Sequence, residues 1–326
     1  MDTPSENGKV NKEKDAGARA RVREESLIRL YRSKMRELSF DFKDNLLAKG
    51  VTGPGGETKQ TVNSPHVGLL RGMRGLNVET LQMLRIGLVQ KVISLKGSDC
   101  GMPHLKEITI YPGYTIPIFD PEKGGEVVAI KMRMFDETYG RYRYLPCPTK
   151  VPPYVIGPTN ARIAIISESE FGAMLWYQEV PAVLCVGLGG ATKPIDEYTH
   201  NLLRKIDLIF IAMDSDPAGT DAAAYLAEKY PQAIRFRCGV AKTWEDRHID
   251  GSSALKKLVE PYETAFEEGM LDIEEETLDE EEEKELATVL GRETRKHFSE
   301  EEIKYLYEKV KAGQEAWRND VEPDPD

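Results

Sequence analysis

The sequence lacks any apolar run of about 18 residues, and its amino terminus is polar and charged, so we expect neither a membrane span nor a secretory signal. Its cysteines are scattered, with no Cys-x-x-Cys pair, at Cys100, Cys147, Cys185 and Cys238. This spacing argues against a zinc site and against a disulfide framework. It fits a protein of the reducing cytoplasm, whether cellular or encoded by a phage or plasmid and acting in its host.

The chain also lacks the local patterns of several common catalytic sites. Its 5 histidines are dispersed, and none belongs to a Ser-His-Asp or histidine–metal pattern. The Gly-rich segment that begins at Val51 has no preceding strand and no Lys-Ser/Thr pair. It is therefore not a P-loop, and we interpret it as a loop or a boundary.

The negative charge is concentrated at the carboxyl end. The 326 residues carry a formal net charge of −11. Residues 261–326 contain 23 acidic and 8 basic side chains, whereas the other 260 residues contain 32 and 36. The body of the chain can therefore offer a basic groove, and nucleic acid remains a possible partner. The acidic segment itself is predicted to form one or two helices that dock on the body or on a partner.

The amino-terminal half divides into three segments. Residues 1–20 are predicted to be a disordered leader, and residues 21–65 a helical segment. The basic face of that helix is either solvated or in contact with nucleic acid. Residues 66–160 are expected to form a smaller α+β subdomain, with a short helix capped by Asn77 and strands near 114–120, 126–134 and 139–145.

Residues 161–260 alternate between strand and helix. Strands are predicted at 162–167, 182–186, 207–213 and 233–237, with helices near 170–179, 194–205 and 217–229. This βαβ series predicts a mostly parallel sheet that is flanked by helices. The overall fold class is therefore α/β, with a smaller subdomain before the sheet and an acidic helical segment after it.

Acidic side chains follow two of these strands. Glu168 comes directly after Ile163-Ala-Ile-Ile-Ser, and Asp214 and Asp216 follow Leu208-Ile-Phe-Ile-Ala-Met. The carboxyl ends of parallel strands meet at one edge of a sheet, where such folds bind ligands. Carboxylate oxygens are the ligands that Mg²⁺ prefers. The pattern therefore indicates phosphoryl chemistry on nucleotides or nucleic acid.

Each acid also has a plainer interpretation. Asp216 can cap the helix that begins at Pro217, but a cap needs only one acid, and neighbouring carboxylates repel without a cation. Glu168 is either an ordinary exposed acid or, in an enzyme of phosphoryl transfer, a metal ligand or the general base for the attacking hydroxyl. Glu170 is predicted to be a solvated acid of the first helical turn. The Gly-rich turn 186–192 either approaches a phosphate, with Lys193 beside it, or is a structural turn.

These residues resemble the motifs of the TOPRIM domain, which primases, topoisomerases and some nucleases share. Glu168 matches the glutamate of the first motif, and Asp214-Ser-Asp216-Pro-Ala-Gly219 matches the second in full. Lys242-Thr-Trp-Glu-Asp246 matches the third, with Thr243 in place of an acid. Ser169 and Gly172 also depart from the usual glycine and aspartate. The resemblance implies Mg²⁺, or Mn²⁺, at Glu168, Asp214 and Asp216. Asp246 would be a further ligand or a loop ion-pair partner, and Thr243 puts a second metal in doubt.

The preceding block resembles the basic subdomain of bacterial and phage primases of the DnaG type. Its order is an Arg-Gly-Leu start at Arg74, an Ile-Pro-Ile strand, and a Tyr-Leu pair at Tyr144, with Pro146 where an asparagine is common. The resemblance implies that basic residues here contact template or nucleotide. The plainer interpretation is that basic and aromatic side chains simply alternate on a strand whose face is solvated. Two lysines of the TOPRIM region are added to this set. The residues predicted to contact template or nucleotide are therefore Arg74, Arg133, Arg143, Tyr144, Lys193 and Lys242.

The sequence therefore favours a primase-like, Mg²⁺-dependent nucleotidyltransferase. It would make short RNA primers from nucleoside triphosphates on single-stranded DNA, with no zinc. The acidic segment would recruit a replicative helicase or another replication protein, and no membrane is expected. Two alternatives remain, which are a TOPRIM nuclease that cleaves DNA and an inactive nucleic-acid-binding adaptor. The intact Glu168, Asp214 and Asp216 favour an active enzyme.

Overall fold

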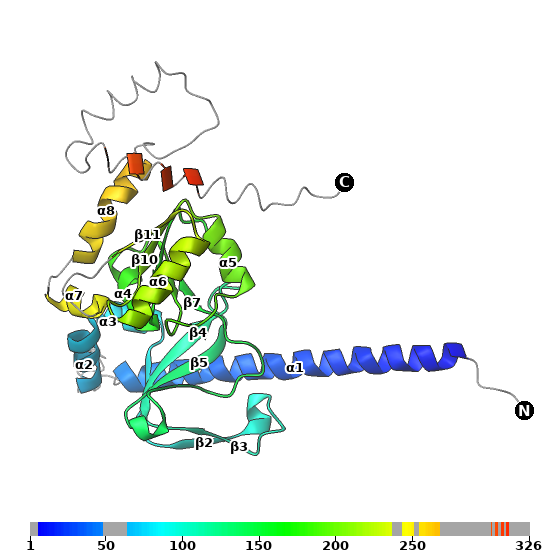
Figure 1. The fold of residues 1–326 in the computed structure, drawn as a ribbon. Helices are drawn as coiled ribbons and strands as arrows, with labels where there is room; N and C mark the ends of the chain where they lie inside the picture. The colour runs from blue at the N-terminus through cyan, green and yellow to red at the C-terminus, as the bar shows by residue number, and fades with distance from the viewer. Residues whose placement is uncertain are drawn as a thin grey trace, which may run out of the picture. The chain divides into compact units, whose positions relative to one another are not determined.

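The computed structural model describes residues 6–47, 64–236, 243–250 and 254–267, together with isolated positions between 301 and 312. The chain divides into two compact units (Figure 1). The first contains residues 1–67 and 81–151, and the second contains residues 68–80 and 152–326. The predicted boundary at 160 thus lies nine residues late, and the predicted helical segment 21–65 belongs to the first unit. Lys242, the Gly-rich segment after Val51 and most of the acidic segment lie outside the described residues.

The first unit begins with one long helix, α1 (Glu6–Leu47). The helix predicted from residue 21 is confirmed, whereas the disordered leader is wrong for residues 6–20, which form the first turns of α1. The physical reason lies in composition, because this stretch is rich in Lys, Ala and Glu and has no proline. Such residues propagate a helix beyond the part that packs on a core, which the search for apolar periodicity could not detect.

Four antiparallel strands form the main sheet of the first unit, in the order β1-β4-β5-β6. They are β1 (Gly87–Val89), β4 (Gly113–Phe119), β5 (Val127–Met134) and β6 (Tyr142–Tyr144), which confirms the predicted hairpin and third strand. A separate two-stranded ribbon pairs β2 (Ile93–Lys96) with β3 (Glu107–Ile110). Single-turn 3₁₀ helices occur at Gly97–Cys100 and Glu137–Tyr139.

Helix α1 covers one face of this sheet. Its buried residues Met35 and Phe42 belong to the same apolar cluster as Met132 of β5. Gly87 lets the helix come close to β1, because a Cβ atom there would lie within clash distance of the Phe42 backbone and side chain. The opposite face of β5 is thereby left to the other set of alternating side chains.

Two short helices precede β1. Helix α2 (Pro65–Arg74) is followed by α3 (Val78–Met83). The predicted cap is confirmed, since the backbone amide of Thr80 donates to Oδ1 of Asn77 at 2.7 Å. Residues 68–80 belong to the second unit, although they precede most of the first unit in sequence. The sequence analysis had placed them with the block 66–160.

The second unit is built on a five-stranded sheet of order β11-β10-β8-β9-β7. Its strands are β7 (Tyr154–Ile156), β8 (Ile163–Ser167), β9 (Leu184–Gly187), β10 (Leu208–Ala212) and β11 (Ala233–Arg235). Four of them run parallel, and β7 is an antiparallel edge strand. The mostly parallel sheet is therefore confirmed. β8, β9 and β10 are buried at every position, as expected for strands covered on both faces.

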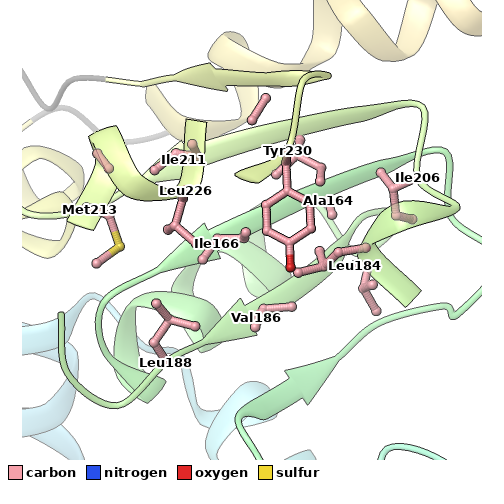
Figure 2. Close-up of a cluster of buried hydrophobic side chains, with 14 of the residues drawn as sticks. Ala164, Ile166, Leu184, Val186, Leu188, Ile206, Ile211, Met213, Leu226 and Tyr230 are labelled. Atoms are coloured by element: carbon pink, nitrogen blue, oxygen red, sulfur yellow. The ribbon is translucent and has the colours of Figure 1, made fainter. Parts of the chain in front are cut away.

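Helices cover both faces of this parallel sheet. One face packs against α5 (Glu197–Arg204) and α6 (Pro217–Lys229), and Figure 2 shows Leu226 and the neighbouring Tyr230 over Ile166 and Val186. The other face carries aromatic contacts such as Phe210 with Tyr262, from β10 to α8. That side holds α4 (Glu170–Glu179), α7 (Trp244–Asp250) and α8 (Ala254–Glu267). Helix α8 continues through the boundary predicted at residue 260. No helix in the described ranges is long and apolar enough to cross a membrane.

Candidate metal and nucleic-acid sites

The register of the parallel sheet brings the first two acids to one edge. β8 and β10 are neighbours, and Ser167 of β8 pairs with Ala212 of β10. Glu168 directly follows Ser167, and Asp214 lies two residues beyond Ala212. Adjacent strands lie about 4.8 Å apart, so both carboxylates leave the sheet at the same end. The two strand–acid motifs predicted this placement, and the register shows it for the backbone, whereas a metal site at these acids stays a prediction.

Asp216 caps helix α6. One carboxylate oxygen, Oδ1, accepts a hydrogen bond from the backbone amide of Gly219 at 2.9 Å, and Pro217 occupies the first helical turn. The capping interpretation is thus confirmed, and it engages one of the two carboxylate oxygens. Gly219 has a separate steric role, because a Cβ atom there would clash with the carbonyl oxygen of Asp214. The short motif therefore fixes the path of the loop on which both aspartates lie.

The chemistry of the three acids fits a Mg²⁺ ion. Glu168, Asp214 and Asp216 offer only oxygen donors, which a hard divalent cation prefers. Within the described residues, no group of three His, Cys, Asp or Glu side chains is arranged as a metal cage. Mg²⁺ commonly binds one or two carboxylates and completes its shell with waters and substrate phosphates, so such a cage is not required.

The turn after β9 holds the backbone of Glu168. The amides of Gly189 and Gly190 both donate to the Glu168 carbonyl oxygen, at 2.8 and 2.9 Å. Gly189 adopts a left-handed φ of 80° in this turn. Two of the amides that were candidates for a phosphate contact are therefore engaged within the protein, which supports the structural-turn interpretation. Lys193 follows this turn and is exposed.

One acid at the start of helix α4, Glu170, is buried where the sequence predicted it to be solvated. Ser169, the residue after Glu168, caps the helix by accepting from the amide of Gly172 at 2.9 Å. Glu170 was predicted to be solvated, but only 2% of it is exposed. Its helix lies against the sheet with nearly its whole first two turns buried, which the mixed sequence Glu-Phe-Gly-Ala did not indicate. Burial raises the pKa of Tyr154 well above its usual value, and the charge of Glu170 raises that pKa further.

Arg74 and Glu245 form a buried ion pair in the second unit. Nη1 of Arg74 lies 3.3 Å from Oε1 of Glu245, whose side chain is 5% exposed. The hydroxyl of Ser169 also approaches Oε1 of Glu245, at 3.4 Å. Arg74 was predicted to contact template or nucleotide, and no role was predicted for Glu245. The sequence carries no signal for this pair, because it depends on residues 68–80 packing in the second unit.

The third motif is only partly described. Thr243, which replaces the usual acid, caps α7 by accepting from the amide of Asp246 at 3.2 Å. Asp246 is exposed, and Lys242 lies outside the described residues. Thr243 thus has a structural role that explains its tolerance at this position, since threonine is a favourable cap.

The first unit presents a basic and aromatic sheet face. β5 and β6 pair Arg133 with Tyr142, and Lys131 with Tyr144. The Arg133 guanidinium and the Lys131 ammonium lie 5.4 and 4.8 Å from the Tyr142 ring centre, within cation–π range. Arg133 also donates to the Met134 carbonyl and to Glu137. Arg133 and Tyr144, both predicted contacts, therefore share one face.

Arg143 lies on the opposite side of that sheet. It pairs with Met132, whose side chain is buried beneath α1, so alternation directs Arg143 away from Arg133. The exposed Arg143 guanidinium lies 5.9 Å from the ring centre of Tyr111. That ring stacks on Tyr139 with centres 4.1 Å apart. Arg133 and Arg143 were both predicted to contact template or nucleotide, but they do not share a face of the sheet, because strand register decides which residues do.

Comparison with known proteins gives matches among solved structures. No protein-family model matches the sequence, and no curated protein gives a significant match. The structure of the DnaG catalytic core is 15% identical, with 88% of this chain and 96% of that chain covered and a TM-score of 0.48. The E. coli primase catalytic core is 14% identical, with 86% and 96% covered and a TM-score of 0.47.

A viral structure is also similar over part of the chain. The primase fragment of the bacteriophage T7 primase-helicase protein is 15% identical, covers 56% of this chain and 69% of that chain, and has a TM-score of 0.36. These three structures are primase catalytic cores or a primase fragment.

Proposed function

We propose that this chain is a DNA primase with a TOPRIM domain, which joins ribonucleotides into short RNA primers on single-stranded DNA. The observation that carries the proposal is the pairing of β8 with β10, because it sets Glu168 and Asp214 at one edge of a parallel sheet. Phosphoryl transfer needs little covalent chemistry from a protein, and positioning and charge stabilisation supply most of the catalysis. Acids at a sheet edge are suited to that task.

The metal in this proposal is Mg²⁺, or Mn²⁺ in its place. Glu168, Asp214 and Asp216 would hold it, and the exposed Asp246 is a further candidate ligand. When bound, the ion neutralises charge on the nucleotide triphosphate and lowers the pKa of the attacking hydroxyl. Glu168 acts either as a ligand or as the group that accepts the hydroxyl proton.

The backbone around the acids supports this role by restricting their movement. Amides of the Gly189–Gly190 turn hold the Glu168 carbonyl, and the Asp216 cap with Gly219 fixes the loop that carries Asp214. Pre-organised carboxylates need little reorganisation when charge develops in the transition state. Acids on a loose loop would lose part of that benefit.

Template binding is assigned to the basic and aromatic face of the first unit. Arg133 would contact backbone phosphate, and Tyr142 and Tyr144 would stack on bases, as in other single-strand binding surfaces. Arg143 would contact phosphate from the other side of the sheet edge. Lys193 and Lys242 would contact nucleotide phosphates.

The acidic segment is proposed to bind a partner. Residues 261–326 carry 23 acidic and 8 basic side chains, which disfavours contact with DNA and suits a basic surface on a helicase or another replication protein. Removal of residues 268–326 should leave primer synthesis on free template unchanged and abolish stimulation by such a partner.

The function is tested by incubating the full chain with single-stranded DNA, labelled nucleoside triphosphates and Mg²⁺ or Mn²⁺. We expect labelled oligoribonucleotides whose sequence is complementary to the template. Shortening of the template instead would assign the chain to the nucleases. Template binding without any product, in the presence of either ion, would contradict primase activity and favour an adaptor.

A further inference from the structure

The Arg74–Glu245 pair is built into the protein rather than displayed on its surface. The side chains are 20% and 5% exposed, and the two charged atoms lie 3.3 Å apart. A buried carboxylate requires a counter-charge or several hydrogen-bond donors to remain ionised. Arg74 supplies the counter-charge here. Arg74 is thus committed to a buried acid, whereas Glu137, the acid paired with Arg133, is 65% exposed and can exchange its partner for solvent.

Ser169 connects the ion pair to Glu168 of the candidate active site. The hydroxyl of Ser169 lies 3.4 Å from Oε1 of Glu245, the same oxygen that contacts Arg74. The same hydroxyl accepts from the Gly172 amide at 2.9 Å and so begins helix α4. Ser169 directly follows Glu168. The orientation of the Glu168 side chain therefore depends on a residue that is held from both sides.

The position of Arg74 is set by the short segment that follows it, which is hydrogen-bonded to α4. Gln178 accepts from the backbone amide of Asn77 at 2.7 Å and donates to the carbonyl of Gly75 at 3.0 Å. The Arg74 guanidinium also lies 5.4 Å from the ring centre of Phe171 on the same helix. These contacts restrict the position of the Arg74 side chain.

Helix α7, which carries Glu245, is also held in place by its contacts. Trp244, its neighbour at the start of α7, is 1% exposed and lies 5.0 Å from Trp176 of α4 between ring centres. Thr243 caps the same helix. Both members of the ion pair are therefore held against helix α4 through different residues, and their contacts join residues 74, 169 and 245, which are distant in sequence.

We propose that Arg74 and Glu245 are positioning residues that fix Glu168 through Ser169, and that Arg74 is not a template contact. Its charge balances Glu245, so that this acid does not repel nucleotide phosphates next to Glu168. The inference deepens the proposed function and rests on it only where activity is measured. The structural coupling itself can be measured without catalysis.

The experiment compares Arg74→Met, Glu245→Gln and the double variant with the wild-type full chain. Arg71→Met is the matched control, because Arg71 lies in the last turn of the same helix and is exposed. Hydrogen–deuterium exchange reports the amides of Gly172 and Asp246. Template affinity at several salt concentrations and kcat and KM for primer synthesis are measured on the same samples.

Arg74→Met should speed exchange at the Gly172 amide and lower kcat by about 10²-fold, as expected for a misplaced catalytic group. Template affinity should stay within twofold, with an unchanged salt slope. The double variant should recover part of both losses, because glutamine needs no counter-charge and the two sites are coupled. Arg71→Met should match the wild type in exchange and in kcat.

Three results would overturn the inference. Weaker template binding, with a salt slope smaller by about 0.7 and unchanged exchange, would make Arg74 a phosphate contact. Faster exchange with unchanged kcat would make the pair purely structural. A loss in the double variant equal to the product of the two single-variant losses would show that the two side chains act separately. A wild-type chain without primer synthesis would contradict the proposed function, while the exchange data would still test the coupling.

Discussion

The two sheets of this protein carry their candidate functional residues in different ways. In the parallel sheet of the second unit, the acids lie beyond the ends of β8 and β10, and the strands themselves are fully buried. In the antiparallel sheet of the first unit, Arg133 and Tyr142 lie within the strands, on a face that α1 does not cover. A strand-end site survives a small error in register. A sheet-face site does not, because a shift of one residue reverses every side chain.

The largest effect is expected at the strand ends. Glu168→Gln should lower the rate of primer synthesis by about 10²- to 10⁴-fold, because a metal ligand or general base is lost while the side-chain shape is kept. Template binding, measured by fluorescence anisotropy, should be unchanged. Glu197→Gln is the matched control, since Glu197 is an exposed acid at the start of α5. Near-wild-type activity of Glu168→Gln would remove this residue from the site.

A second pair of variants separates the two roles of Asp216. Asparagine caps a helix as well as aspartate does, but it lacks the charge that a metal ion needs. If both roles hold, Asp216→Asn should keep the melting temperature and lose most activity. Asp216→Ala should also lose about 1 kcal/mol of stability through the missing cap. Full activity of Asp216→Asn would mean that Asp216 only caps α6.

Substitutions on the sheet face of the first unit should have smaller effects, and these should appear in template binding rather than in the rate of primer synthesis. Arg133→Ala is expected to weaken template binding and reduce the salt slope by about 0.7, as one phosphate contact is lost. Tyr142→Ala should weaken binding by about 1–3 kcal/mol through lost stacking, with the slope unchanged. Lys205→Ala, at an exposed lysine that ends α5, is the control. If Arg143→Ala has a larger effect than Arg133→Ala, the opposite side of the sheet is the binding face.

The smallest effect concerns the exposure of one cysteine in each unit. Cys147 of the first unit is partly exposed, whereas Cys185 lies in the buried strand β9. Burial raises the pKa of the Cys185 thiol, so it holds its proton up to a higher pH and yields little reactive thiolate. A thiol reagent at pH 8 should modify Cys147 first and Cys185 only after unfolding. Mass spectrometry of the digested protein gives the order, and early labelling of Cys185 would show that the parallel sheet opens readily.

Much of the second unit could be predicted from sequence because its signals are local. Strands such as Ile163–Ser167 are continuous apolar runs, and an acid directly follows each of the two that matter. The helix cap at Asp216 was also visible, since Pro217 follows it. These features require no knowledge of which segments lie next to one another.

The remaining features depend on tertiary contacts. The opposite directions of Arg133 and Arg143 follow from the register of β5 and β6, which the sequence leaves open. The burial of Glu170 and Glu245 depends on the packing of α4 and α7. Helix α1 was underestimated because its first turns follow helix propensity without an apolar stripe.

The most direct test of the account is primer synthesis by the wild type and by Asp214→Ala, each measured with template binding and melting temperature. The account predicts Mg²⁺-dependent oligoribonucleotides from the wild type and none from the variant, while binding and stability stay nearly the same. Equal primer synthesis by both proteins would contradict the assignment of the strand-end acids to a metal site.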